Sequence, residues 1–169
     1  MAEAFTLRIS DELAEEVRAL GAGTYPDECC GALLGREDKE SFGAASREAG
    51  AKDSCTSRSV MGLFPLVNRR DDSPRNRFSV TSEDVMEAEK AARIQGLEVI
   101  GWYHSHPDHP ARPSAYDRDH AWPWYSYVIV SVEAGNPKDL TSWRLEDDRS
   151  KFQPEEILPV RIASHKTQG

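Results

Sequence analysis

The chain has 169 residues, which is typical of one domain and enough to bury a core without disulfide or metal staples. Its 38% hydrophobic and 30% charged residues indicate a soluble globular protein. The net charge of −8 argues against a protein that binds nucleic acid by neutralising phosphates. No apolar run approaches the roughly 20 residues of a membrane helix, so we expect neither a nucleic-acid nor a membrane partner.

The N-terminal part is predicted to hold a strand, a helix and a second strand. Residues 5–10, "FTLRIS", alternate between apolar and polar and indicate a strand. Ser10 is placed to cap a helix over 11–21, which has acids in its first turn and ends on a glycine. The apolar run 29–35, "CCGALLG", predicts a buried strand that begins just after Glu28.

The cysteines and the N-terminus bear on the compartment. Cys29, Cys30 and Cys55 are odd in number and include no C-x-x-C pair, which excludes a thiolate zinc ribbon and fits a reducing cytoplasm. No basic segment followed by an apolar one opens the chain, so we expect no signal peptide. Cys29 and Cys30 begin an apolar strand and are predicted to be small buried residues.

The middle of the chain is more polar. We expect strands near 42–48 and 58–66 and a solvated, arginine-containing loop over 68–77, "NRRDDSPRNR". An alternative for those arginines is that they position an acidic partner. Ser82 is predicted to cap a helix over 83–96.

The C-terminal half is predicted to be mainly β-structure. A strand over 97–107 leads into a proline-rich loop and a short helix that begins near Ser114. This mixture of strands and helices indicates α/β or α+β structure in one layered domain. Three more strands are expected, over 125–133, 139–147 and 157–163.

The stretch "HSHPDHPARPSAYD" has the residues of a metal site. His104 and His106 are two apart at the end of a strand, so their side chains point to the same face. Pro107 stops the strand, which places the pair at the carboxyl end, where open α/β sheets bind ligands. Catalytic zinc needs about three protein ligands and an open position. Asp117, on the same side of the short helix as Ser114, would make a set of two nitrogens and one oxygen that suits zinc.

Two further residues are candidates for the chemistry of such a site. Activation of water and protonation of a leaving amine require a base near the metal, and Glu28, at the mouth of a buried strand, is the best candidate. A hydroxyl beside the metal could stabilise an oxyanion, and Ser114 is placed for that role. Both have alternatives. Glu28 could be a solvated acid beside Asp27, and Ser114 with Asp117 also forms a helix capping box.

Together these residues resemble the JAMM (MPN+) metalloprotease pattern. Glu28 precedes His104-x-His106, then seven residues, Ser114, two residues and Asp117. The likeness covers most of the chain and is closest to the compact bacterial type. Four neighbouring segments also carry it: "PDECCGALLG", "VIGWYHSHP", "YVIVSV" and "SWRL".

This resemblance implies a fold and a ligand set. The fold would be α/β, a cytidine-deaminase-like mixed β-sheet flanked by helices, in a single domain over 1–169 with its core at about 5–147 and a C-terminal strand and tail over 148–169. One zinc ion would be held by three residues and a bound water. Glu28 would be the general acid/base and Ser114 the oxyanion donor, and the zinc ligands would be His104, His106 and Asp117.

The resemblance also implies an activity. Such enzymes are zinc-dependent metallopeptidases or isopeptidases, which hydrolyse an amide or isopeptide bond at the C-terminal tail of a ubiquitin-like or sulfur-carrier protein. The chain lacks the long insertions with which eukaryotic members hold ubiquitin, so ubiquitin itself is not the expected substrate. The oligomeric state is left open.

Three other functions compete with this one. A non-catalytic MPN scaffold would bind partners only, but such proteins normally lose ligand residues that are all present here. A zinc deaminase shares the fold, but its His-x-Glu and Pro-Cys-x-x-Cys signature is absent. A RadC-like DNA-associated protein is disfavoured by the acidic charge.

The remaining histidines and the tryptophans are given ordinary roles. His109 and His120 are predicted to lie in the loop and on the helix surface, and His109 is a candidate for the wall of a substrate channel. The tryptophans are predicted to be core or site-wall residues: Trp102, Trp122, Trp124 and Trp143.

Overall fold

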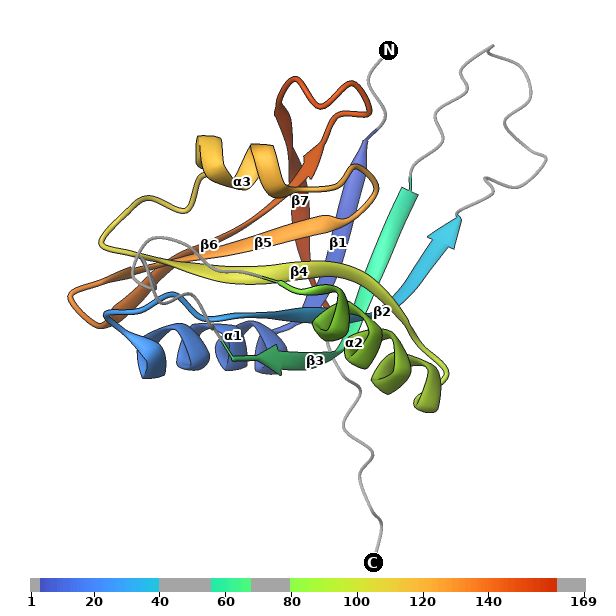
Figure 1. Ribbon diagram of the computed structural model, residues 1–169, viewed down its shortest axis with the longest axis horizontal. Coiled ribbons are helices and arrows are strands. Elements are labelled where there is room, and N and C mark those ends of the chain that lie inside the picture. Colours follow the sequence, from blue (N-terminus) through green and yellow to red (C-terminus); the bar gives the residue numbers. More distant parts are fainter. Residues whose placement is uncertain (1–3, 40–55, 68–79, 161–169) are drawn as a thin grey trace, which may run out of the picture.

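Seven strands form one mixed sheet in the computed structural model, which describes residues 4–39, 56–67 and 80–160 (Figure 1). The strands are β1 (Phe5–Ser10), β2 (Cys30–Lys39), β3 (Thr56–Leu66), β4 (Glu98–Pro107), β5 (Ser126–Glu133), β6 (Asn136–Leu145) and β7 (Phe152–Val160). The helices in this part of the chain are α1 (Asp11–Thr24), α2 (Ser82–Ile94) and α3 (Ala115–His120). The predicted mixed sheet flanked by helices is confirmed.

The order of the strands explains why β4 is central. The sheet runs β1-β3-β2-β4-β5-β6-β7, and β1 also pairs with β7, so the sheet closes on itself. The sequence pattern did not indicate this closure. β4 is antiparallel to β2 and parallel to β5. Because it has a neighbour on both sides, β4 is a fixed support for the side chains that it carries.

Both faces of the central strands are buried. Leu33 packs into a cluster with Val17 of α1, whereas Ala32 and Leu34 pack into a second cluster with Ala88 of α2. Since neighbouring side chains of a strand point to opposite faces, α1 and α2 cover opposite faces of β2. This arrangement explains the continuous apolar run that predicted a buried strand.

Two helix ends differ from the predictions. α1 continues to Thr24 instead of ending at Gly21, because this glycine serves close packing: a Cβ there would lie 3.1 Å from Val132 and 3.2 Å from Val130. The cap of α2 is Thr81, whose hydroxyl accepts from the Asp84 N–H while the Asp84 carboxylate accepts from the Thr81 N–H. Ser82 is the first helical residue and not the cap.

The caps of the other two helices are as predicted. Ser10 accepts a hydrogen bond from the Leu13 N–H at the start of α1, and Ser114 caps α3. Several predictions fall outside the described residues: the strand at 42–48, the arginine-containing loop, Cys55, and the last residues of the predicted strand 157–163.

A buried polar cluster links the strands far from the histidines. The Glu155 carboxylate of β7 accepts hydrogen bonds from Arg144 Nε at 2.7 Å and from Ser142 Oγ at 2.8 Å. It also accepts from Ser126 Oγ at 3.2 Å, and Ser126 Oγ in turn accepts from Arg58 at 3.0 Å. β7 is therefore connected to the interior by charge as well as by its backbone.

None of the helices described is long and apolar enough to cross a membrane.

Candidate metal centre

β4 positions two histidines on one buried face. His104 and His106 are separated by one residue, and both side chains are buried on the side of the sheet that holds Trp102. Cys30 of β2 and Ile129 of β5 flank His104 in the ladder. The strand therefore fixes both imidazoles through backbone pairing on both sides.

α3 presents the third side chain. Ser114 Oγ accepts a hydrogen bond from the Asp117 N–H at 3.1 Å, and Asp117 Oδ2 accepts one from the Ser114 N–H at 2.8 Å. These two bonds form the capping box that was weighed as an alternative role for this pair, and that role is confirmed. The cap also fixes the direction in which the Asp117 carboxylate points.

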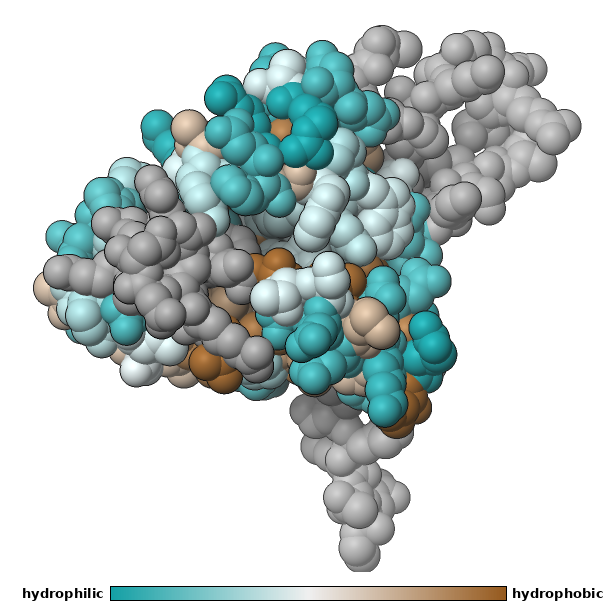
Figure 2. Space-filling model, in the orientation of Figure 1, coloured by the Kyte–Doolittle hydropathy of each residue, from teal (hydrophilic) through white to brown (hydrophobic). Residues whose placement is uncertain are grey.

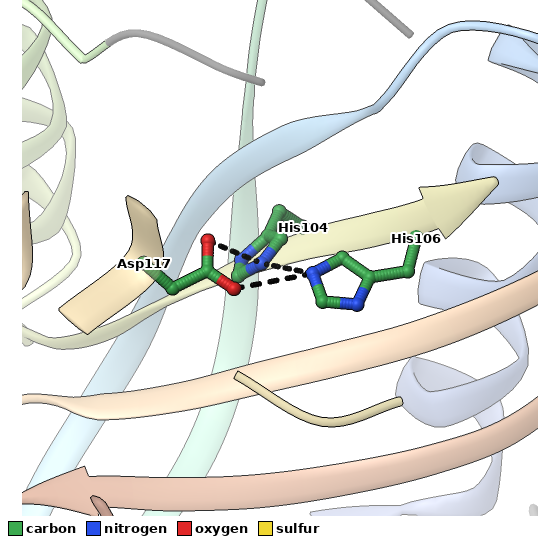
Figure 3. Close-up of side chains that lie close together, drawn as sticks. All are labelled: His104, His106 and Asp117. Carbon is green, nitrogen blue, oxygen red and sulfur yellow. Dashed lines mark hydrogen bonds and ion pairs between the residues drawn. The ribbon is translucent and has the colours of Figure 1, made fainter. Parts of the chain in front are cut away.

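Potential ligand atoms of three side chains converge (Figure 3). The Nε2 atoms of His104 and His106 lie 3.1 Å apart. Asp117 Oδ1 lies 3.3 Å from His104 Nε2, and Asp117 Oδ2 lies 3.2 Å from His106 Nε2. Ligand atoms about 2.0–2.1 Å from a tetrahedral zinc ion are about 3.3 Å from one another. The observed spacing fits that geometry, so this group could hold a metal ion.

The protonation states also fit a metal site. His106 Nδ1 donates to the Pro110 carbonyl at 2.8 Å, which leaves the Nε2 lone pair facing His104 and Asp117. Burial lowers the pKa of His104 and favours its neutral form. Burial raises the pKa of Asp117, but the two imidazoles and the Ser114 N–H outweigh it and hold this pKa far below its ordinary value. His104 is therefore a neutral nitrogen donor and Asp117 an anionic oxygen donor.

Glu28 is buried at the start of β2, with only 4% of its surface exposed. The next residue is fixed to the histidine strand: the Cys29 N–H donates to Ser105 Oγ at 2.8 Å, and the Ser105 N–H donates to the Cys29 carbonyl at 3.1 Å. Burial, and then the charge of Asp117, raises the pKa of Glu28 to about 9. The reading of Glu28 as a solvated acid is therefore wrong, since the carboxyl lies inside the protein.

The comparison with protein families decides the identity. The family described as prokaryotic homologs of the JAB domain, Prok-JAB, matches residues 10–146. This chain belongs to the Prok-JAB family. The family match confirms the likeness to JAMM (MPN+) proteins that the five-residue pattern indicated.

Named relatives of this Prok-JAB chain include two enzymes. It is 31% identical over 124 residues to the desampylase of Haloferax volcanii, covering 73% of this chain and 76% of that protein. It is 29% identical over 126 residues to the Lys-63-specific deubiquitinase BRCC36 of Bos taurus, covering 71% of this chain. This chain spans only 34% of BRCC36.

A solved structure agrees with the fold of the Prok-JAB chain. The solution structure of a protein from Desulfitobacterium hafniense matches with a TM-score of 0.72 and 32% identity, covering 95% of this chain and 97% of that one. The likeness therefore extends through β7, beyond the residues that the family match covers.

Beside the metal-site residues of this Prok-JAB chain lies an aromatic hollow of about 160 Å³, which the sequence analysis did not predict. His109 is absent from its walls, whereas His120, predicted to be a helix-surface residue, contributes to them while staying exposed. The spacing of Tyr116 and His120, four apart on one helix, was the available signal. The hollow is lined by Val80, Trp102, His104, Tyr116, Asp117, His120, Ala121, Trp122 and Tyr127.

The adjacent cysteines of the Prok-JAB chain are small buried residues, as predicted. Cys29 and Cys30 are both free thiols. Burial raises the pKa of Cys29 to about 11 and that of Cys30 to about 12. Because a thiolate is the reactive form, neither is suited to act as a nucleophile.

Proposed function

We propose that this chain is a zinc-dependent metalloprotease. It hydrolyses an amide or isopeptide bond at the C-terminal tail of a ubiquitin-like or sulfur-carrier protein. The observation that carries this proposal is the convergence of His104, His106 and Asp117 within 3.1–3.3 Å. Glu28 is buried next to Cys29, whose backbone N–H is hydrogen-bonded to the same strand. The names of the two relatives, a desampylase and a deubiquitinase, support the choice of a ubiquitin-like substrate.

In this proposal, the residues that would hold one zinc ion, together with a water, are His104, His106 and Asp117. The chemistry that zinc supplies in such sites is Lewis-acid polarisation of a carbonyl and a water whose pKa is lowered to about 7. The chain's own contribution is to keep His104 neutral and the Asp117 carboxylate charged, and to fix all three side chains by backbone pairing or capping.

Glu28 takes the proton from the attacking water and returns it to the leaving amine. Its place before β2 and the hydrogen bonds between Cys29 and Ser105 hold the carboxyl beside the histidine strand. A positioned carboxyl typically contributes about 10²–10⁴-fold to such proton transfers.

Ser114 donates a hydrogen bond to the oxyanion that develops on the carbonyl. Its hydroxyl oxygen accepts from the Asp117 N–H, which leaves the hydroxyl hydrogen available for donation. Capping and oxyanion stabilisation are thus compatible in one side chain, because they use different parts of the hydroxyl group. Its exposure leaves room for a substrate to approach.

The first experiment measures metal content and cleavage together. The purified chain is expected to hold about one zinc per chain. It should release the tail adduct from a ubiquitin-like or sulfur-carrier protein of the same organism, as followed by intact mass. A chelator should abolish the release, and added zinc should restore it. Full activity of metal-free protein would refute the proposal.

Two variants separate binding of the metal from chemistry. Asp117→Asn is expected to lose zinc and activity together, because it removes the anionic ligand. Glu28→Gln is expected to keep zinc and to lose about 10²-fold or more in kcat. If Glu28→Gln keeps both zinc and full biological activity, the chain is instead a non-catalytic MPN scaffold.

The proposed location of the protein is the cytoplasm. The free thiols of Cys29 and Cys30 fit such a reducing compartment.

A further inference from the structure

The aromatic hollow lies directly against the proposed ligands. His104 and Asp117 form one side of it, and the other walls come from β4, β5, α3, the connection between α3 and β5, and Val80, which precedes α2. Figure 2 shows pale surface of intermediate hydropathy on this face, between α3 and α2. A side chain inserted there would lie within one or two residues of the bond that the proposed enzyme cleaves.

The size and composition of the hollow fit one apolar side chain. A protein cavity of about 150 Å³ lined by apolar residues accepts benzene. At about 160 Å³, the hollow has room for one aromatic ring or one branched aliphatic side chain. Its walls consist mainly of aromatic side chains, which suit such a group better than a charged one.

The walls are already held in place. Tyr116 and His120 stack with their ring centroids 3.9 Å apart. The Trp122 N–H donates to the Tyr127 hydroxyl at 2.8 Å, and this bond holds the segment between α3 and β5 against β5. Trp102 is fully buried in the central strand. A preformed pocket of this kind binds with little ordering of its own side chains.

The position of Glu28 indicates which part of a substrate enters. Cys30 pairs with His104 in antiparallel register, so Glu28 lies toward the His106 end of β4, whereas the hollow is lined by Trp102 and His104, toward the start of that strand. In a tetrahedral intermediate, the attacking oxygen and the leaving nitrogen both exchange protons with the general acid/base and lie near it. The acyl chain therefore extends away from Glu28, toward the hollow.

We propose that the aromatic hollow is a specificity site that binds an apolar or aromatic side chain from one of the last three residues on the acyl side of the cleaved bond. This inference rests on the proposed function and narrows its substrate class. The enzyme selects carrier proteins whose C-terminal tail has a bulky apolar side chain close to the bond. An extended residue spans about 3.3 Å, so residues further back lie beyond the hollow.

The test uses a set of tail peptides joined to one constant leaving amine. Glycine, leucine and phenylalanine are placed in turn at each of the last three acyl-side positions. With the zinc-loaded chain, kcat/KM is expected to rise on the order of ten- to hundredfold for leucine or phenylalanine at one of these positions. The free tail acids are titrated in parallel against the full chain, as purified and after chelation. Tryptophan fluorescence serves as the readout, because Trp102 and Trp122 line the hollow.

Two variants change the hollow in opposite ways. Ala121→Leu fills it and is expected to abolish the preference for bulky tails over glycine tails. Trp122→Ala removes an outer wall without removing the backbone N–H that bonds to Tyr127, and is expected to lower the preference at least tenfold. Trp124→Ala is the matched control, because Trp124 is 46% exposed against 47% for Trp122 and does not line the hollow.

The outcomes distinguish the two proposals. Zinc-dependent cleavage with equal kcat/KM for all tails, or a preference unchanged in Trp122→Ala and Ala121→Leu, overturns the specificity site and leaves the proposed function standing. A second outcome is that no tail is cleaved, but apolar tails bind more tightly than glycine tails. If Trp122→Ala removes this binding preference and Trp124→Ala does not, the result supports the site and refutes the proposed function. Absence of both selective binding and selective cleavage overturns the site.

Discussion

Glu28, the buried acid of the proposed chemistry, makes the stability of the folded chain depend on pH. Glu28 is almost fully enclosed, and burial, with the charge of Asp117, raises its pKa from an ordinary 4.5 to about 9. Between these values the folded, metal-free chain keeps a proton that the unfolded chain releases. Stability from this group is therefore complete below pH 4.5 and is lost as the pH rises toward 9.

The first prediction is that Glu28→Gln stabilises the metal-free protein at alkaline pH. Glutamine fills the same space without an ionisable group, so the variant should gain on the parent by up to about 1.4 kcal/mol for each pH unit above the ordinary pKa of a glutamate. Chemical unfolding of the chelated proteins at intervals from pH 5 to 9 measures this difference. Asp27→Asn is the matched control and should track the parent. Equal slopes for the parent and Glu28→Gln would contradict the prediction.

Local spacing predicted part of this site and could not predict the rest. A spacing of two positions in a strand was enough to place His104 and His106 on the same face. A spacing of three positions at the start of a helix was enough to place Asp117 beside Ser114. Glu28 is different, because its approach depends on the pairing of Cys29 with Ser105, 76 positions later. Nothing in the local sequence reports that register, so the strand pattern made Glu28 a candidate with a solvated-acid alternative, and the family pattern decided between them.

At the scale of the elements, the helix ends show that local capping can be predicted from the sequence, whereas packing between elements cannot. Ser82 and Thr81 are adjacent capping residues of similar chemistry, and the choice between them depends on which one has an acid three positions later. Thr81 has Asp84, and this pair forms the capping box of α2. At Gly21 the deciding factor is contact of α1 with β5, which cannot be read from the helix sequence.

The second prediction concerns this cap. Thr81→Ala should lower the free energy of unfolding by about 1 kcal/mol, because the Asp84 N–H loses its acceptor and the box is broken. Ser82→Ala, one residue later, is the control and should change stability by less than about 0.5 kcal/mol. Thermal and chemical unfolding of both variants decide the matter. A larger loss for Ser82→Ala would assign the cap to that residue.

At the scale of the whole molecule, the closing strand contributes a charge to the interior. Glu155 of β7 accepts three hydrogen bonds, from Arg144, Ser142 and Ser126. Arg144 is itself buried, as is Arg58, which packs over the ring of Trp124 at 4.3 Å. Arg58 pairs with the Glu37 carboxylate of β2 at 3.2 Å, whereas β7 provides the carboxylate that pairs with Arg144.

The third prediction follows from that cluster. Glu155→Ala should lower the free energy of unfolding by about 3–5 kcal/mol, because it leaves the buried Arg144 without its carboxylate partner. Glu156→Ala, at the exposed neighbouring position, should change it by less than about 0.5 kcal/mol. Denaturant unfolding of both variants is the measurement. A loss below 1 kcal/mol for Glu155→Ala would show that the cluster tolerates an unpaired charge.

The pairing of β1 with β7 also bears on the order of folding. It joins Thr6 to Glu156 and Ser10 to Val160, so the sheet cannot close until β7 has been synthesised. Contacts between such distant positions form slowly, because a long loop must close first. During synthesis, we expect the edge of β1 that pairs with β7 to stay unpaired after β4 and β5 have already formed their pairing. An unpaired edge is a site of misassociation, so aggregation during expression should depend on how quickly the C-terminal strand emerges.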